Sequence, residues 1–202
     1  MAITRQPQTL TLTPGARITA QEYARLPEEH GWRTELYRGV VVKMPLIKNP
    51  RHDWIVSNLH AALAAYVMPR KLGRLTLEQV GYEATLSGEP DQTIWGPDVA
   101  FVSAAHVPAM LEAVGRGDYA PAPDLVVEIV SDSQSRPEMR ERSERWLQAG
   151  TRLVWNVWPD AQTVDVWTPD EPMCTLKASD LLDGLDVVPG FSLPIADLFV
   201  FA

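Results

Sequence analysis

The sequence predicts a single compact α/β domain. Its 202 residues, 46% of them hydrophobic and 22% charged, can bury one core without disulfides or a second domain. Segments with the two-residue period of strands also alternate with segments of helical period. We expect residues 1–18 to form a loose N-terminal arm and residues 19–202 to form the domain, because residues 1–13 are polar and rich in threonine.

The first elements are a short helix, a β-rich segment and a long helix. Residues 19–26 begin with the S/T-x-x-E pattern of a capping box and predict a helix that ends before the next proline. Residues 35–44 predict a strand, and alternation along that strand would place Glu35 and Lys43 on the same face. Hydrophobic residues at helical spacing predict a helix over residues 51–68, which the following proline ends.

The middle of the chain predicts a hairpin and a buried strand. Residues 74–86 and 93–102 have strand character, and Ser-Gly-Glu-Pro-Asp between them favours a turn, so we expect a long hairpin. Residues 104–119 fit either a short helix or a flexible loop. Residues 124–130 are hydrophobic on both faces, which is typical of a central strand that is covered on both sides.

A second long helix follows the buried strand. Ser135 and Pro137 predict its start, and Gly150 is placed to cap its end. The helix carries four arginines, which are Arg136, Arg140, Arg142 and Arg145. They are spread around the helix, so we expect most of them to be solvated or paired with neighbouring glutamates.

The C-terminal part predicts strands and short closing segments. Residues 152–158, 163–168 and 173–177 have strand character and are separated by Pro-Asp turns. Residues 179–182 and 194–199 are expected to be short helical or irregular segments. The whole order of elements alternates helices with strands, which agrees with an α/β domain.

The composition argues against several classes of protein. A net charge of −8, from 18 basic and 26 acidic residues, argues against the broad basic surface of many nucleic-acid-binding proteins, although a divalent cation on a carboxylate cluster reverses the charge locally. The one cysteine, Cys174, cannot form an intramolecular disulfide, and no hydrophobic run approaches the ~20 residues that span a bilayer. Because residues 1–13 lack signal-peptide features, we expect a cytoplasmic protein with no membrane partner.

Two acidic residues stand in hydrophobic strands. Glu128 interrupts Leu-Val-Val-Glu-Ile-Val, where an ionised carboxylate needs a cation, a hydrogen-bond network or a proton to offset its lost hydration. Asp98 follows Pro97 in another apolar strand, and alternation allows both acids to emerge on one face of adjacent strands. The alternatives are that Glu128 ends its strand and reaches an arginine of the next helix, and that Asp98 caps a turn.

Paired carboxylates of this kind favour Mg²⁺ or Mn²⁺ as the cofactor. Such ions take one or two carboxylates and keep several waters, which substrate phosphate can replace. Zinc is poorly supported, because the single cysteine and the four histidines have neither C-x-x-C nor H-E-x-x-H spacing. The sequence therefore predicts Asp98 and Glu128 as the metal-binding pair.

Six short segments, taken in order, resemble the signature segments of the Uma2 (DUF820) family in the PD-(D/E)XK nuclease superfamily. They are residues 35–45, 51–52, 97–102, 123–131, 150–155 and 188–193. The resemblance implies a restriction-endonuclease-like core, in which a central mixed β-sheet is flanked by helices, and a homodimer. It also implies that Asp98 and Glu128 are metal ligands and that Glu35 and His52 are additional members of the site. The alternative for Glu35 is a strand-edge residue paired with Lys43 or Arg38, and for His52 it is a local hydrogen bond at a helix N-terminus.

One residue departs from the pattern that the resemblance implies. Relatives place a lysine on the helix after the second acid, four residues before an aromatic residue, and here that position holds Arg142, four residues before Trp146. Arginine stays protonated and cannot act as a base, although it can hold a phosphate or stabilise negative charge. Activation of water would then fall to the metal or to Lys43.

These observations favour Mg²⁺-dependent hydrolysis of DNA phosphodiester bonds. The candidate catalytic residues are Asp98, Glu128, Arg142, Glu35, His52 and Lys43. The alternative is a catalytically inactive protein that keeps the nuclease fold as a dimeric scaffold or nucleic-acid-binding module, which Arg142 and the acidic composition favour. A third class, hydrolysis of glycosides by paired carboxylates, has no further support in the sequence.

Overall fold

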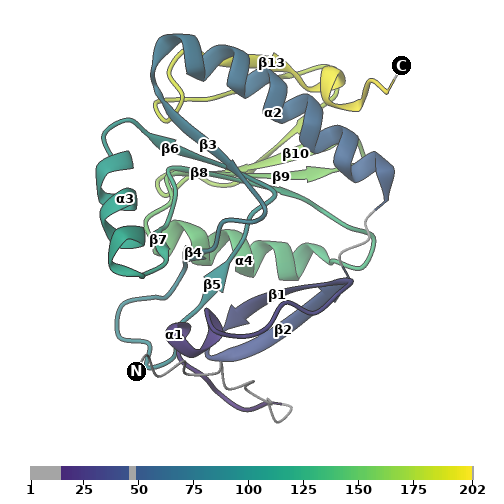
Figure 1. Ribbon diagram of the computed structural model, residues 1–202. Helices are drawn as coiled ribbons and strands as arrows, with labels where there is room; N and C mark the ends of the chain where they lie inside the picture. The colour runs from purple at the N-terminus through teal and green to yellow at the C-terminus, as the bar shows by residue number, and fades with distance from the viewer. Residues whose placement is uncertain (1–14, 46–48, 202) are drawn as a thin grey trace, which may run out of the picture.

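The structure is a computed structural model that describes residues 15–45 and 49–201 (Figure 1). Within these residues a larger sheet has six strands, which are β3 (Gly73–Leu77), β6 (Val99–Ser103), β8 (Leu125–Ile129), β9 (Leu153–Trp158), β10 (Thr163–Trp167) and β11 (Cys174–Lys177). They lie in the order β11-β10-β9-β8-β6-β3. β8 and β9 pair in parallel, whereas the other neighbours pair antiparallel.

A smaller sheet lies beside the larger one. In the described part of the chain it has five strands, which are β1 (Trp32–Tyr37), β2 (Val40–Pro45), β4 (Tyr82–Glu83), β5 (Ile94–Trp95) and β7 (Ala120–Pro121). Their order is β2-β1-β5-β4-β7, with β4 and β7 in parallel. The predicted α/β class with mixed sheets is confirmed.

Helices separate and cover the sheets. They are α1 (Ala20–Tyr23), α2 (Pro50–Arg70), α3 (Val107–Arg116) and α4 (Arg136–Gln148). α2 covers one face of the larger sheet, and α4 lies between the opposite face and the smaller sheet (Figure 1). Any side chain that leaves the larger sheet toward α4 therefore enters a space that both sheets enclose.

The strand β8 is central, as its hydrophobic composition predicts. Leu125, Val127 and Ile129 are buried in the cluster that contains the apolar residues of α2. Val126 points to the other face and packs in the cluster that contains Trp146 of α4. A polar side chain on that second face is removed from bulk water by α4.

The two long helices begin at side-chain caps. Ser135 accepts a hydrogen bond from the N–H of Glu138, whose carboxylate accepts the N–H of Ser135 in return, so α4 starts where the sequence predicts. Asn49 caps α2 by accepting the N–H of Arg51. α2 continues one residue beyond Pro69, so the proline does not end the helix where the sequence predicts, although it removes one helical hydrogen bond.

The β-rich segment at residues 35–44 is a hairpin and not one strand, which corrects the prediction. Arg38 and Gly39 both have positive φ, at 48° and 76°, as a two-residue type I′ turn requires. The hairpin places Glu35 opposite Val42. Lys43, the next residue along, therefore points to the other face of the smaller sheet, and Glu35 and Lys43 do not share a face.

The expected long hairpin over residues 74–102 is divided between the sheets. β3 pairs with β6 in the larger sheet, whereas β4 pairs with β5 in the smaller one. The chain crosses between the sheets at Gly96, where an added Cβ would lie 2.7 Å from the carbonyl oxygen of Glu78. Glycine is needed for this close approach, and the crossing brings Asp98 to the start of β6.

The C-terminal segments differ in part from the prediction. Residues 179–182 include the start of β12 (Leu181–Asp183), which pairs with β13 (Ser192–Pro194), so the expectation of a helical or irregular segment is wrong there. Leu182 faces Leu193 across this pair and is buried. The 3₁₀ helix η1 (Ile195–Phe199) agrees with the expected helical closure.

The predicted N-terminal arm lies mostly outside the described residues, which begin at residue 15. Arg17 forms an isolated β-bridge with Val40, and the N–H of Ile18 donates to the carbonyl of Gly39 over 2.8 Å. In the part of the chain that is described, none of the helices combines the length and the hydrophobicity that crossing a bilayer demands.

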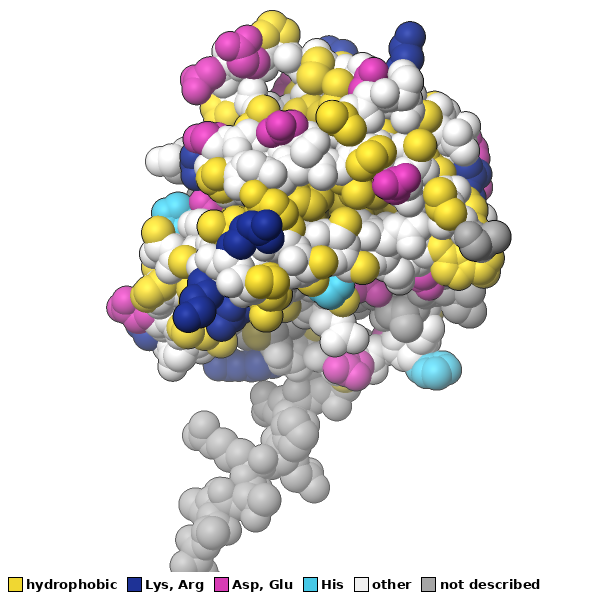
Figure 2. All heavy atoms as spheres, turned by 90° about the horizontal axis from the view of Figure 1, so that it is seen from above, with side chains coloured by type: hydrophobic (Ala, Val, Ile, Leu, Met, Phe, Trp, Pro, Cys, Tyr) yellow, Lys and Arg dark blue, Asp and Glu magenta, His cyan; other side chains and the backbone are white. Residues whose placement is uncertain are grey.

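The surface over α2 carries no continuous basic band. Figure 2 views this face, on which hydrophobic side chains are widespread and acidic side chains are scattered. Basic side chains gather there in small groups. This distribution agrees with the net charge of −8.

Candidate functional site

Asp98 and Glu128 lie on neighbouring strands of the larger sheet. β6 and β8 pair with Val99 opposite Val127, and continuing this antiparallel register by one residue sets Asp98 opposite Glu128. Oδ2 of Asp98 accepts the N–H of Ile129 over 2.7 Å. The two acids therefore emerge on one face of adjacent strands, as alternation predicts, and both are buried.

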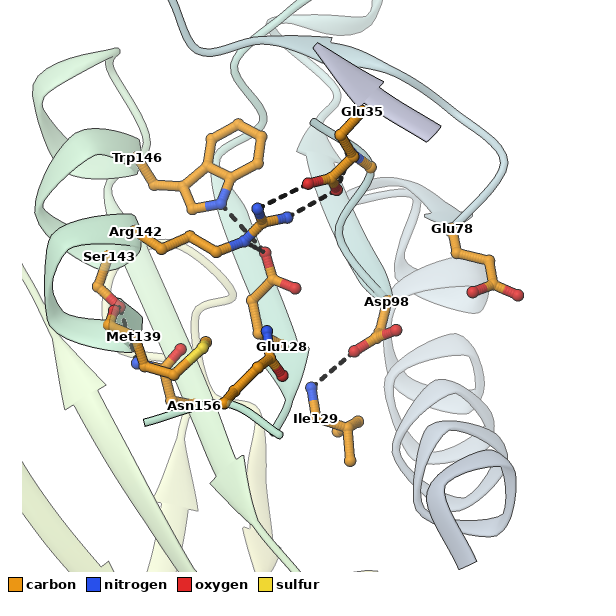
Figure 3. A network of polar contacts seen from close by, with 12 residues as sticks. Glu35, Glu78, Asp98, Glu128, Ile129, Met139, Arg142, Ser143, Trp146 and Asn156 are labelled. Carbon is orange, nitrogen blue, oxygen red and sulfur yellow. Dashed lines mark hydrogen bonds and ion pairs between the residues drawn. The ribbon is translucent and has the colours of Figure 1, made fainter. Parts of the chain in front are cut away.

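Arg142 joins two of the acidic residues (Figure 3). Its Nε donates to Oε1 of Glu128 over 2.7 Å. Its two terminal nitrogens donate to the carboxylate of Glu35 over 2.8 and 2.9 Å. Its guanidinium carbon also lies 4.3 Å from the ring centre of Trp95, a distance at which the cation and the ring attract each other.

The position of Arg142 depends on how α4 is fixed to the larger sheet. The next residue, Ser143, donates from Oγ to the carbonyl of Met139 over 2.8 Å and accepts from Nδ2 of Asn156 over 2.7 Å. Asn156 lies beside Glu128 in the parallel pair of β8 and β9. This buried contact holds the helix over Glu128 (Figure 3).

Glu35 reaches the site from β1 of the smaller sheet. Besides Arg142, it accepts the N–H of Gly96 over 3.1 Å and a terminal nitrogen of Arg33 over 3.3 Å. Burial raises the pKa of Glu35, but the charge and hydrogen bonds of Arg142, with Arg33 and the N–H of Gly96, lower it more. The resulting pKa is below the ordinary value of 4.5, so this acid is a stable carboxylate at neutral pH.

Glu128 has the opposite shift. Burial raises its pKa; Arg142 lowers it, and the nearby charges of Asp98 and Glu35 raise it again, so the net pKa is above 4.5. Its Oε1 also accepts the indole N–H of Trp146 over 3.2 Å. Its other oxygen, Oε2, has no hydrogen-bond donor among the described residues.

The neighbouring carboxylates keep Arg142 positively charged. Burial lowers the pKa of the guanidinium, but the charges of Glu128 and Glu35 and their hydrogen bonds raise it well above its ordinary value. All three guanidinium nitrogens are engaged by carboxylates. Arg142 is thus a permanent cation that ties the two sheets together through their acids.

His52 and Lys43 have different positions relative to the acids. His52, in the first turn of α2, has Nε2 3.3 Å from Oδ2 of Asp98. Lys43 instead forms an ion pair with Glu29 on the outer face of the hairpin. The fold therefore brings together Asp98, Glu128, Arg142, Glu35 and His52 and leaves Lys43 outside, because the turn in the hairpin reverses its face.

Two tryptophans and one arginine in this site were not anticipated from the sequence. Trp146 donates to Glu128, Trp95 lies against Arg142, and Arg33 contacts Glu35. Trp146 follows Arg142 by four residues, a spacing that places both on one face of a helix. That spacing could have indicated a shared partner, whereas Trp95 and Arg33 depend on long-range contacts that no local pattern shows.

Burial alone does not distinguish the candidate site, because two other acids are buried elsewhere. Asp124 accepts from the N–H of Ser103 and from Nδ1 of His106, so both its oxygens are engaged. Both oxygens of Asp165 likewise accept hydrogen bonds, from the side chains of Arg136, Trp158 and Thr175. Glu128 differs in having an oxygen without a donor in the described structure.

The donor set of the site decides whether it fits a metal ion. Among the described residues, no cluster of three or more His, Cys, Asp or Glu side chains is arranged to hold a metal. Asp98 and Glu128 nevertheless supply two hard oxygen donors on adjacent strands, and burial raises the pKa of Glu128 in spite of Arg142, so that its ionised form would gain from a further cation. This fits Mg²⁺ or Mn²⁺, which need only one or two protein carboxylates.

A comparison with family models identifies the chain. The model for Uma2, described as "Putative restriction endonuclease", matches residues 20–196. The chain belongs to the Uma2 family. The motif resemblance in the sequence is thereby confirmed.

A solved structure supports the same relationship for this Uma2 protein. It is the crystal structure of "a putative nuclease belonging to DUF820" from Anabaena variabilis ATCC 29413, with 26% sequence identity and a TM-score of 0.73. The similarity covers 90% of this chain and 97% of that one. A search of curated proteins gives no match. Family and structural neighbour both indicate a nuclease fold of the restriction-endonuclease type.

Proposed function

We propose that this Uma2 protein is a Mg²⁺- or Mn²⁺-dependent endonuclease that hydrolyses DNA phosphodiester bonds, with Asp98 and Glu128 as metal ligands. The observation that carries the proposal is the state of Glu128. Its carboxylate is buried, its pKa is raised, and Oε2 has no donor in the described structure although Asp98 lies on the adjacent strand. A buried acid in this state is stabilised by an additional cation.

The chain's own residues have distinct parts in this proposal. A divalent ion bound at the two acids would lower the pKa of a water and offset charge on the reacting phosphate. The N–H of Ile129 and the imidazole of His52 orient Asp98 through Oδ2. Arg142 holds Oε1 of Glu128 and so leaves Oε2 for the ion.

We assign Arg142 as a positioning residue and not as a residue that binds phosphate. Its three nitrogens already bind carboxylates, so a direct phosphate contact would require breaking at least one of these bonds. Glu35 in turn fixes the guanidinium plane by accepting two parallel hydrogen bonds. Lys43 has no part in the proposed chemistry, since it pairs with Glu29 away from the acids.

Cleavage of supercoiled plasmid in Mn²⁺ tests the proposal. We expect the wild type to nick the plasmid, and Asp98→Asn and Glu128→Gln to lower the rate by at least about 100-fold, because each removes a metal-binding charge. Glu112→Gln, which changes an exposed carboxylate on α3, is the matched control and should cleave as the wild type does. Equal rates in all four proteins would refute the assignment of the two acids.

Calorimetric titration with Mn²⁺ tests the metal site apart from catalysis. One binding event is expected in the wild type and in Glu112→Gln, and none in Asp98→Asn. A wild type that binds no Mn²⁺ and cleaves no plasmid would support the second candidate function, an inactive nuclease-fold scaffold. The specific observation that favours this second candidate is Arg142, which already places a cation between two of the acids. The homodimer, the cytoplasmic location and a single domain over residues 19–202 stay predictions.

A further inference from the structure

A large groove lies next to the candidate site. It runs between the segment that follows α1, the hairpin of β1 and β2, and the connection from β3 to β4, and its volume is about 1510 Å³. Sites for single small ligands usually have about 300–1,000 Å³. The groove is therefore large enough for an extended chain of several units.

The groove shares two residues with the surroundings of the candidate site. Arg33 and Gly96 both line it, and both donate hydrogen bonds to the carboxylate of Glu35. Gly96 also precedes Asp98 by two residues at the crossing between the sheets. Asp98 and Glu128 do not themselves line the groove, so a chain bound there would lie at the edge of the site, next to Glu35.

The charges that line the groove do not suit a phosphate backbone. Among the described residues that line the groove, the lysine and arginine residues are Lys43 and Arg33, and the acidic residues are Glu28, Glu29 and Glu78. Arg33 is paired with Glu35 and Glu78, and Lys43 with Glu29. Because phosphate binding depends on available cations, a nucleic-acid strand would not bind here through its phosphates.

The aromatic residues of the groove do suit nucleobases. Trp32, at the start of β1, lines the groove and has 43% of its surface exposed. Tyr23 and Tyr119 stack on each other with ring centres 6.0 Å apart and line the same groove. An uncharged, flat base gains from stacking on such rings and is not repelled by the acidic side chains.

We infer that the groove binds unpaired nucleotides of a DNA substrate, with the bases turned inward against Trp32 and the phosphates turned toward solvent. The inference rests on the proposed nuclease function and names its substrate class, which is DNA with a single-stranded segment. A blunt duplex is excluded from the groove because its bases are stacked on each other and only its phosphates and groove edges are available.

Fluorescence anisotropy with a labelled oligonucleotide in EDTA tests this inference without any requirement for cleavage. The wild type should bind single-stranded DNA more tightly than a blunt duplex of equal length. Trp32→Ala should weaken single-strand binding about tenfold, and Trp32→Phe should keep most of it, because a phenyl ring still stacks. Trp54→Ala is the matched control, since Trp54 is similarly exposed, at 50%, but lies on α2 against Phe201.

Two further readouts keep the inference open to refutation if Trp32→Ala does not fold. Affinity should depend weakly on salt, with a slope of log K against log salt shallower than about −1.4, which corresponds to no more than about two phosphates. In the wild type, 5-bromodeoxyuridine in the single strand should crosslink to Trp32 on irradiation. Equal or tighter duplex binding, a steep salt slope, or crosslinks confined to other regions would overturn the inference. Loss of plasmid cleavage with these binding results intact would instead overturn only the proposed function.

Discussion

Glu35 and Glu128 are both buried and both bind Arg142, yet their environments have opposite effects. Glu35, on β1 of the smaller sheet, accepts from two nitrogens of Arg142, from the N–H of Gly96 and from Arg33. Glu128, on β8 of the larger sheet, has two donors from α4 on one oxygen, and Asp98 lies beside it on β6. The pKa of Glu35 is accordingly lowered and that of Glu128 is raised.

The difference shows that one arginine cannot satisfy both acids. The guanidinium presents its paired terminal nitrogens to Glu35 and only Nε to Glu128. Because bidentate pairing is the stronger arrangement, Glu35 receives most of the stabilisation. Glu128 would gain more from a further cation than Glu35 would, and this asymmetry is the reason why Glu128 is the proposed metal ligand of the two.

Removing the shared cation should have the largest effect. Arg142→Ala leaves two buried carboxylates without their main partner, and loss of one member of a buried ion pair costs about 3–5 kcal/mol. Urea unfolding should show this loss in the free energy of unfolding. Arg116→Ala, which breaks pairs among exposed side chains on α3, should cost less than about 1 kcal/mol. Similar losses in the two variants would contradict the bridging role of Arg142.

Neutralising the two acids one at a time should show that they contribute differently to stability. In the absence of divalent metal, Glu35→Gln should cost about 2 kcal/mol, because it weakens charge-assisted hydrogen bonds that the folded state favours. Glu128→Gln should cost less, since burial and its acidic neighbours already disfavour the ionised form. Urea unfolding at neutral pH measures both. A greater loss for Glu128→Gln would reverse the comparison.

The pH dependence of stability should differ in sign between the two acids. The folded pKa of Glu35 is below its ordinary value of 4.5, so its stabilisation is present above pH 4.5 and is lost as the pH falls through the folded pKa. The folded pKa of Glu128 is above 4.5, so stability decreases as the pH rises from 4.5 through that pKa.

Urea unfolding from about pH 3 to about pH 8 in EDTA should resolve the two contributions. Glu35→Gln should reduce the loss of unfolding free energy as the pH falls below 4.5. Glu128→Gln should reduce the decrease in unfolding free energy as the pH rises above 4.5. Curves that change in the same direction for both variants would show that the two acids titrate alike.

The smallest effect is expected for Arg33→Gln. Arg33 contacts Glu35 at 3.3 Å and Glu78 at the surface, and partly exposed pairs contribute about 0–1 kcal/mol. Glu35 should keep its lowered pKa, because Arg142 is the larger cause. Measurement of the Glu35 carboxyl shift by NMR during an acid titration would check this, and a pKa returned to its ordinary value would assign the effect to Arg33 instead.

Local patterns predicted the parts of the site that depend on single elements. β8 and α4 follow from a hydrophobic run and from the cap at Ser135. The pairing of Asp98 with Glu128 follows from strand alternation once the strands are adjacent. These features are local in sequence, so periodicity and capping chemistry were sufficient.

The parts that were mispredicted depend on turns and on contacts between distant segments. The predicted single strand includes Arg38 and Gly39, which puts Lys43 on the same face as Glu35, whereas these two residues form a turn. The first position of the turn holds arginine and not the Asn, Asp or Gly that usually signals a two-residue hairpin turn. The division of residues 74–102 between two sheets follows from the crossing at Gly96, which depends on the packing of both sheets. The partners of Arg142 likewise come from separate sheets. A contact between Glu128 and an arginine of the next helix was one of the alternatives for that acid, whereas no short pattern could have identified the contact with Glu35.

The two-residue turn at Arg38 and Gly39 limits the insertions and deletions that this part of the sequence can accept. Side chains alternate along each arm of the hairpin, so inserting or deleting one residue within β1 would exchange its inner and outer faces beyond that point. Glu35 would then be turned to the opposite face of β1, and both Arg142 and the N–H of Gly96 would lose the acceptor that it provides. Relatives that keep this cluster should therefore align here without gaps, while length variation is confined to segments outside the hairpin.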